Sequence, residues 1–143
     1  MALIWTKELS VGNAVIDSDH KRLMELVNDI AHVAKTRDSF AMLRAIKLFR
    51  LGINRHFINE EQFAQMLDFP FAPHKLAHQN MRVELDFTEH ELSQGGIEIT
   101  RVMEHYADFL RGWLIKHITE EDMQMKPALQ SRPYGFKNIA DQK

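Results

Sequence analysis

The feature that most constrains the fold is the helical spacing of apolar residues in four segments of the chain. In the first segment, Leu23, Leu26, Val27 and Ile30 recur at the i, i+3, i+4, i+7 spacing of one helix face. No segment shows useful strand-like alternation, and no internal repeat is present. The pattern predicts an all-α chain whose helices bury their apolar faces against one another.

Turn-forming residues between these segments set the expected helix boundaries. We expect an extended arm over residues 1–16, helices over about 17–37, 39–66, 73–92 and 97–119, and a further short helix before the prolines at 127 and 133. Long helices with short connections predict an up-down-up-down antiparallel four-helix bundle. The bundle and its arm would form one domain over residues 1–130, followed by a polar tail over 131–143.

Residues at the helix ends support these boundaries. Asp17 and Ser18 can cap the first helix and Ser39 the second, because short polar side chains accept hydrogen bonds from the first backbone amides. Pro73 suits the first position of the third helix, and Gly95-Gly96 closes it.

Composition excludes several classes of function. The chain has no cysteine, which rules out disulfides, zinc–thiolate sites and thiol catalysis. A net charge of −2 with dispersed lysine and arginine gives no reason to expect a nucleic-acid or membrane partner. No apolar run approaches the roughly 18 residues of a membrane span, and no signal peptide is recognisable, so we expect a cytoplasmic protein.

Five of the eight histidines stand at positions suited to binding a metal. The pairs on the second and third predicted helices are four residues apart, so the members of each pair share one helix face. Each predicted helix supplies at least one strong ligand: His20 on the first, His56 and Glu60 on the second, His74 and His78 on the third, and His117, followed by Asp122, on the fourth.

Imidazoles and carboxylates together suit iron, manganese or zinc. Burying so many polar groups without a metal would carry a large desolvation cost. Suppose that Glu60, Asp122 and a solvent-derived oxygen bridge two ions. The three histidines of the third and fourth helices then complete six ligands on one ion, and the remaining two histidines leave the other ion with five. A small molecule could bind at that vacancy.

Asp122 requires an irregular helix. Five residues on a regular helix place it about 140° around the axis from His117. Both side chains can face one site only if the helix ends or widens into a π-type turn, and we predict such a turn near residues 118–121.

Taken together, these residues resemble the hemerythrin family, specifically the bacterial hemerythrins, up to about residue 126. The matching stretches are residues 16–23 (IDSDHKRL) and 56–61 (HFINEE), the His-x-x-x-His motif at 74–78, and residues 113–118 (WLIKHI) with Asp122. The resemblance implies two non-haem iron ions per chain, bridged by Glu60, Asp122 and an oxo or hydroxo group. It further implies reversible dioxygen binding by a carrier or storage protein, rather than catalysis by an enzyme.

The resemblance also assigns a ligand pocket. Trp113, Leu114 and Ile118 match family pocket residues, although they can equally be core residues. Gly52 stands where a large aromatic residue is frequent, and Met81 where phenylalanine is usual. We therefore consider a wider pocket with faster ligand exchange or autoxidation; the alternative is that a neighbouring side chain fills the gap.

Other uses of buried histidines and carboxylates fit less well. No Glu-x-x-His motif of a ferritin-like enzyme, His-Glu-x-x-His motif of a zinc protease or His-Asp dipeptide of a phosphohydrolase occurs. The open alternatives share the di-iron centre: an oxygen or redox sensor, a protein that reacts with peroxide or nitric oxide, or an iron buffer. We expect a monomer with dioxygen as its partner.

Overall fold

The helices of the computed structural model follow the predicted order along the chain. The structure describes residues 2–94 and 99–132. The four long helices are α1 (Ala14–Val33), α2 (Ser39–Met66), α3 (Ala72–Gln94) and α4 (Ile99–Lys116). The shorter elements are the 3-10 turns η1 (Lys7–Leu9) and η2 (Ala34–Thr36), the π-helical turn η3 (His117–Glu121), the 3-10 turn η4 (Asp122–Met125) and α5 (Lys126–Leu129).

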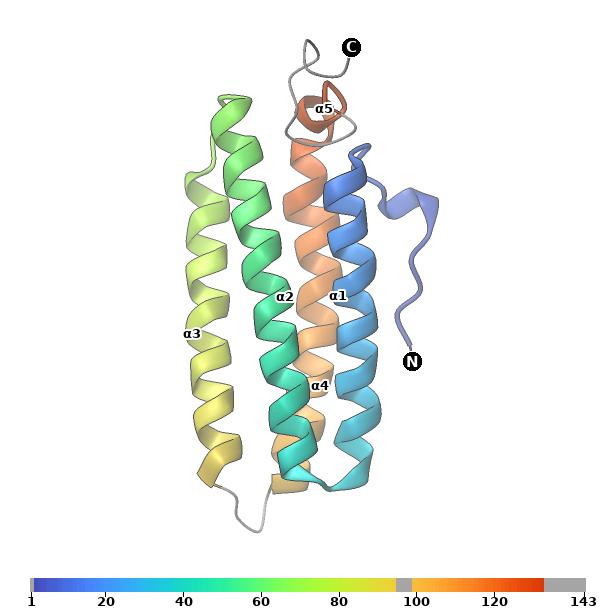
Figure 1. Ribbon diagram of the computed structural model, residues 1–143, viewed down its shortest axis with the longest axis vertical. Coiled ribbons are helices and arrows are strands. Elements are labelled where there is room, and N and C mark those ends of the chain that lie inside the picture. Colours follow the sequence, from blue (N-terminus) through green and yellow to red (C-terminus); the bar gives the residue numbers. More distant parts are fainter. Residues whose placement is uncertain (1, 95–98, 133–143) are drawn as a thin grey trace.

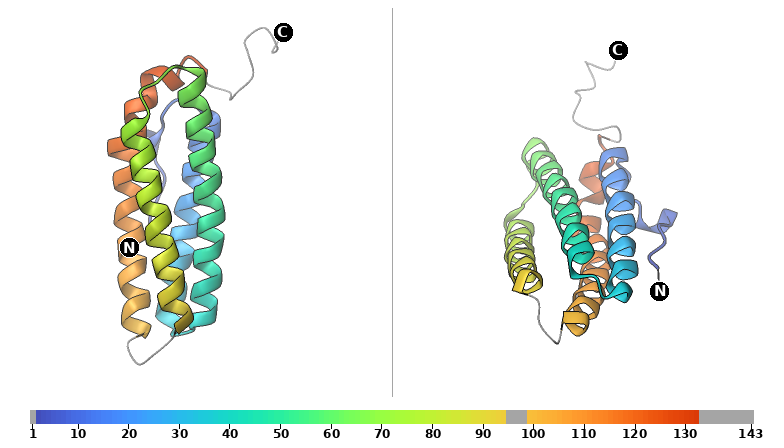
Figure 2. Two further views of the ribbon diagram at one scale, coloured as in Figure 1. Left: turned by 90° about the vertical axis from the view of Figure 1, so that its left-hand side faces the viewer. Right: turned by 60° about the horizontal axis from the view of Figure 1, so that its bottom comes forward.

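The four long helices run antiparallel, each in the opposite direction to the one before it (Figure 1). α1 packs against α2 and α4, and α2 packs against α3. The two further views show the N-terminal arm beside α1, on the side away from α3 (Figure 2). The predicted all-α antiparallel four-helix bundle is therefore confirmed. No helix in the described residues is both long and apolar enough to cross a membrane.

The start of α1 differs from the prediction. The helix begins at Ala14, and its N-cap is Asn13, whose side-chain oxygen accepts hydrogen bonds from the backbone amides of Val15 and Ile16. Asp17, the predicted cap, instead accepts hydrogen bonds from the Ser10 hydroxyl at 2.5 Å and the Val11 amide at 2.9 Å. Its carboxylate thus holds the arm against the helix, and the arm is shorter than expected.

The other boundaries lie close to their predicted positions. Asp38, one residue before the predicted cap Ser39, is the N-cap of α2 and accepts a hydrogen bond from the Ala41 amide at 3.0 Å. α3 begins one residue before Pro73. The predicted break at Gly95-Gly96 and residues 133–143 of the predicted tail (131–143) lie outside the described residues.

Two apolar clusters lie at different heights in the bundle. The larger runs along the interior and includes Phe49 and Ile53 of α2 and Leu110 of α4. The smaller lies at the end where α1 begins and includes Phe63 and Leu129. The polar residues singled out above belong to neither cluster.

The Asn13 cap leads to a testable expectation. Asn13 is almost fully buried, and besides capping α1 its side-chain amide donates to the carbonyl of Arg132. We expect Asn13→Ala to lower the free energy of unfolding by about 1–2 kcal/mol, because the first amides of α1 lose their acceptor. Urea unfolding followed by circular dichroism measures this. The exposed Gln62→Ala is the control, and equal losses in the two variants would contradict the capping role.

Candidate metal centre

The five histidines and two acids singled out by the sequence gather at one end of the bundle. α1 and α3 begin at this end, and α2 and α4 finish there, because neighbouring helices are antiparallel. All seven are buried, with exposures of 0% for six of them and 4% for His74. The other three histidines, His32, His90 and His105, are exposed.

Glu60 lies between histidines from three helices. Its Oε1 is 2.6 Å from His56 Nε2 and 3.5 Å from His117 Nε2. Its Oε2 is 2.9 Å from His78 Nε2. The two oxygens therefore face imidazoles on opposite sides of the carboxylate, as a bridging carboxylate would.

Asp122 likewise lies among several of the histidines. Its Oδ2 lies 2.7 Å from His20 Nε2 and 3.1 Å from Nε2 of both His56 and His117. The carboxylate can face inward together with His117 because residues 117–121 form a π-helical turn. The predicted irregularity is confirmed, and it offsets the 140° separation of a regular helix.

The ligand atoms form two groups that share Glu60. One group consists of His20, His56, Glu60 and Asp122, and the other of Glu60, His78 and His117; within each, the nitrogen and oxygen atoms lie within 4.8 Å of one another. The histidines divide as expected from counting ligands, except that His74 belongs to neither group; Asp122, expected in both groups, belongs only to the first.

The exception is His74, which belongs to neither group. Its Nε2 is 3.9 Å from Asp122 Oδ1 and forms a hydrogen bond of 2.8 Å with the backbone carbonyl oxygen of Glu121. Phe71 stacks on the His74 ring, with centroids 5.1 Å apart. The side chain lies beside the cluster. To bind a metal ion through Nε2, it would have to give up its hydrogen bond with the Glu121 carbonyl oxygen.

Opposite charges shift the pKa values of the four innermost groups. Burial favours the neutral form of His56 and His117, but Glu60 and Asp122 outweigh it and hold both imidazole pKa values well above their usual range. Burial and the charge of Asp122 would raise the pKa of Glu60, yet the two histidines lower it to about 2. The pKa of Asp122 is held well below its usual range, chiefly by His117 despite burial. Without metal, imidazolium groups thus neutralise the carboxylates.

The protons on the histidines do not provide every buried oxygen of the cluster with a hydrogen bond. Glu60 Oε1 and Asp122 Oδ1 are buried and have no hydrogen-bond partner among the described residues, despite their close nitrogen neighbours. The Nε2 atoms of His56 and His117 lie only 3.4 Å apart. Buried polar atoms in native proteins almost always have partners. Cations held by nitrogen and oxygen would supply them, so the donor set fits a metal site without sulfur.

Comparison with known proteins places the chain in a family. Residues 11–130 match the sequence profile of the hemerythrin HHE cation binding domain. The chain belongs to the hemerythrin family. The match runs from the arm to the short helix α5, so it includes all four long helices and the clustered side chains.

Individual hemerythrin relatives agree with this assignment. The chain is 30% identical to a bacteriohemerythrin of Stenotrophomonas maltophilia over 124 residues, covering 84% of this chain and 76% of the relative. It is 25% identical to a bacteriohemerythrin of Campylobacter jejuni, covering 83% of this chain and 89% of the relative. The crystal structure of a wild-type hemerythrin shares the fold, with a TM-score of 0.82 at 23% identity over 91% of this chain and 99% of that one.

Aromatic and aliphatic side chains surround the cluster. Phe57 stacks on His78 with ring centroids 3.7 Å apart, and Trp113 stacks on His117 at 4.8 Å. Leu114 and Ile118, two of the residues assigned to the pocket by resemblance, are fully buried. These contacts hold the imidazole rings in place and keep the surroundings of the cluster apolar.

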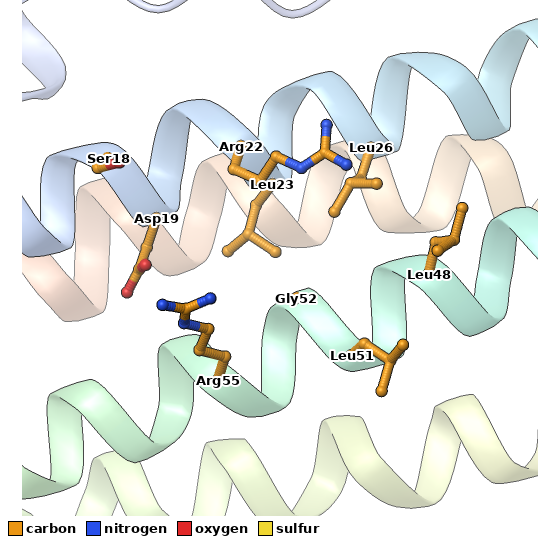
Figure 3. A pocket seen from close by; sticks show the side chains of 9 residues that line it. All are labelled: Ser18, Asp19, Arg22, Leu23, Leu26, Leu48, Leu51, Gly52 and Arg55. Atoms are coloured by element: carbon orange, nitrogen blue, oxygen red, sulfur yellow. The ribbon is translucent and has the colours of Figure 1, made fainter.

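The two departures from the usual family pattern have different surroundings. Met81 is buried in the main core. Gly52 lies in the wall of a surface groove between α1 and α2, shown in Figure 3. A Cβ atom at Gly52 would lie 2.9 Å from Leu26 Cδ1 and 3.4 Å from Leu23 Cδ2. Neighbouring side chains therefore occupy the inner side of the gap, which favours the second of the two alternatives considered above.

Three acids outside the seven approach the outward-facing nitrogens of the histidines. Asp19 Oδ2 lies 3.2 Å from His56 Nδ1, Glu61 Oε1 lies 3.6 Å from His78 Nδ1, and Glu121 Oε1 lies 3.5 Å from His117 Nδ1. Asp19 and Glu61 lie within the sequence stretches that resemble the hemerythrins, but neither residue was assigned a role from the sequence. Each acid directly adjoins a proposed ligand in the sequence, and that adjacency was the available signal.

Asp19 makes the best-defined of these contacts. It accepts a hydrogen bond of 2.9 Å from Asn59, which fixes the carboxylate toward His56. Such a partner orients a metal-binding imidazole and makes it a stronger ligand. We expect Asp19→Asn to weaken iron binding about 10- to 100-fold, measured by competition with a chromophoric chelator. Asp29→Asn, an exposed change on the same helix, should leave iron binding unchanged; a similar loss there would point to a general charge effect.

Proposed function

We propose that this chain holds two iron ions between its four helices and uses them to bind dioxygen reversibly. The observation that carries the proposal is the pair of ligand groups joined through Glu60, one with His20 and His56 and the other with His78 and His117. A site for a single ion would need no second group. Iron is the metal that resemblance to the hemerythrins implies, and the nitrogen and oxygen donors suit it.

The two sides of the cluster contain different numbers of histidines. We assign His20 and His56 to one ion and His78 and His117, joined by His74, to the other, with Glu60 and Asp122 bridging. The side with His20 and His56 would therefore supply one histidine fewer than the other side. We place the dioxygen site on the side of His20 and His56.

When bound, a pair of ferrous ions supplies the two electrons that dioxygen takes up on binding and returns on release. The chain's own residues then have to orient the ligands and keep water out. Phe57 and Trp113 fix the ligand rings by stacking, and Leu114 and Ile118 add buried apolar surface. A dry, apolar surrounding slows loss of protons and of reduced oxygen. This role requires no catalytic acid or base, so we propose a binding protein.

Repeated oxygenation tests this function. The protein is loaded with ferrous iron without oxygen, exposed to oxygen, degassed and exposed again while its visible spectrum is recorded. We expect an absorption band that appears with oxygen and fades on degassing through several cycles. Irreversible conversion to the ferric spectrum in the first cycle would contradict reversible binding. It would favour a redox sensor or a protein that reacts with peroxide or nitric oxide.

A further inference from the structure

A groove of about 400 Å³ runs along the surface between α1 and α2 (Figure 3). Its volume lies within the range of small-molecule sites, roughly 300–1,000 Å³. Because the helices are antiparallel, Ser18, Asp19 and Arg55 lie toward one end and Leu26, Leu48 and Leu51 toward the other. The groove thus has one polar end and one apolar end.

Gly52 makes the groove possible. It lies between the two ends on the α2 wall, where any side chain would enter the space facing α1. Even a single Cβ atom there would lie 2.9 Å from Leu26 Cδ1. Glycine within a helix costs about 1 kcal/mol relative to alanine. The chain accepts that cost at the position that opens the groove.

The apolar end exposes side chains that a folded protein usually buries. Leu51 is 68% exposed and Leu48 is 53% exposed, and both line the groove. Leu23 and Leu26 form its inner surface and are almost fully buried. A hydrocarbon chain lying over Gly52 would contact all four leucines and remove the outer two from water.

The polar part of the groove has more available positive charge than negative charge. Arg22 and Arg55 stand on opposite walls; the Arg55 guanidinium lies near Asp19, and the Arg22 guanidinium extends toward Leu26 (Figure 3). Arg55 makes no ion pair or hydrogen bond through its side chain with any residue in the described part of the chain, and Arg22 pairs only with exposed Glu25 at 3.1 Å. Asp19 is the one acid lining the groove in that part of the chain, and it already accepts from Asn59 and faces His56.

We propose that this groove binds an amphiphilic monocarboxylate of the medium-chain fatty-acid class. Its hydrocarbon tail would lie over Gly52 against the leucines, and its carboxylate would lie beside the guanidinium of Arg55. A guanidinium binds a carboxylate through two parallel hydrogen bonds, which favours this head group over a neutral or cationic one. The site is separate from the proposed dioxygen position, although Asp19 belongs to both surroundings.

Calorimetric titration of the iron-loaded full chain with hexanoate, octanoate and decanoate, below micelle-forming concentrations, tests the proposal. We expect affinity to rise about two- to fourfold per added methylene, the value for partial to full burial. Decyltrimethylammonium, with the same tail and the opposite charge, should bind far more weakly. Equal affinity for decanoate and the cation, or no detectable decanoate binding, would overturn the proposal.

Variants locate the ligand. Arg55→Gln should weaken decanoate about tenfold, because a charge-assisted hydrogen-bond pair is lost. The matched control Arg44→Gln, exposed on the same helix outside the groove, should bind normally. Gly52→Leu should abolish decanoate binding. Gly52→Ala should weaken it, and this smaller change provides the test if the leucine variant folds poorly. Unchanged affinity in Arg55→Gln and Gly52→Ala would overturn the assignment. None of these measurements depends on oxygen binding, so the two proposals fail independently.

Discussion

Replacing Glu60 by glutamine is expected to leave the chain without its pair of metal ions. Glu60 is the residue shared by both ligand groups, and its two oxygens face His56 and His117 on one side and His78 on the other. The amide keeps the size of the side chain but removes the negative charge and one acceptor oxygen. We expect iron to fall from two ions per chain to one or none, with loss of the oxygen-dependent absorption band, measured by metal analysis and visible spectroscopy.

A matched control separates this effect from a general loss of charge. Glu104→Gln changes an exposed glutamate on α4 and should retain two irons per chain. Circular dichroism would show that both variants remain helical. Two tightly bound irons in Glu60→Gln would contradict the bridging role.

Removal of iron is expected to lower the stability of the bundle by several kcal/mol. A metal that binds only the folded chain adds about 4 kcal/mol when its free concentration is a thousand times its dissociation constant. The metal-free bundle should still fold, since imidazolium–carboxylate pairing neutralises the cluster and the main core does not include it. Urea unfolding of iron-loaded and chelator-treated protein measures the difference.

The Glu60→Gln variant is also the control for metal removal. Its unfolding should be nearly the same with and without iron, because it cannot hold the pair. If the unmodified chain unfolded at the same urea concentration with and without iron, the cluster would not be a site at which metal binding supports the fold.

Local sequence patterns predicted the helices well because helix formation and apolar periodicity act over a few residues. The four helices follow from apolar spacing and turn-forming residues, and the π-helical turn at residues 117–121 follows from requiring His117 and Asp122 to face one site. The predicted start of α1 was wrong because three nearby polar residues, Asn13, Asp17 and Ser18, can all cap a helix. Asp17 became the anchor of the arm through contacts with Ser10 and Val11, which a search for caps does not consider.

Contacts between helices were harder to predict than residues on one helix. His56 with Glu60 and His74 with His78 were singled out because residues four apart share a helix face, and His20 and His117 because each predicted helix then supplies a ligand. The approach of Asp19 to His56 joins α1 and α2, and no local pattern contains it. The carbonyl partner of His74 was equally unpredictable, since the Glu121 backbone belongs to the π-helical turn of another segment.

Anomalous diffraction at the iron absorption edge from crystals of the iron-loaded protein tests the central claim most directly. We expect two neighbouring iron peaks beside the carboxylates of Glu60 and Asp122, with His20 and His56 at one and His74, His78 and His117 at the other. A single peak, or two peaks that do not share Glu60, would contradict the proposed di-iron centre.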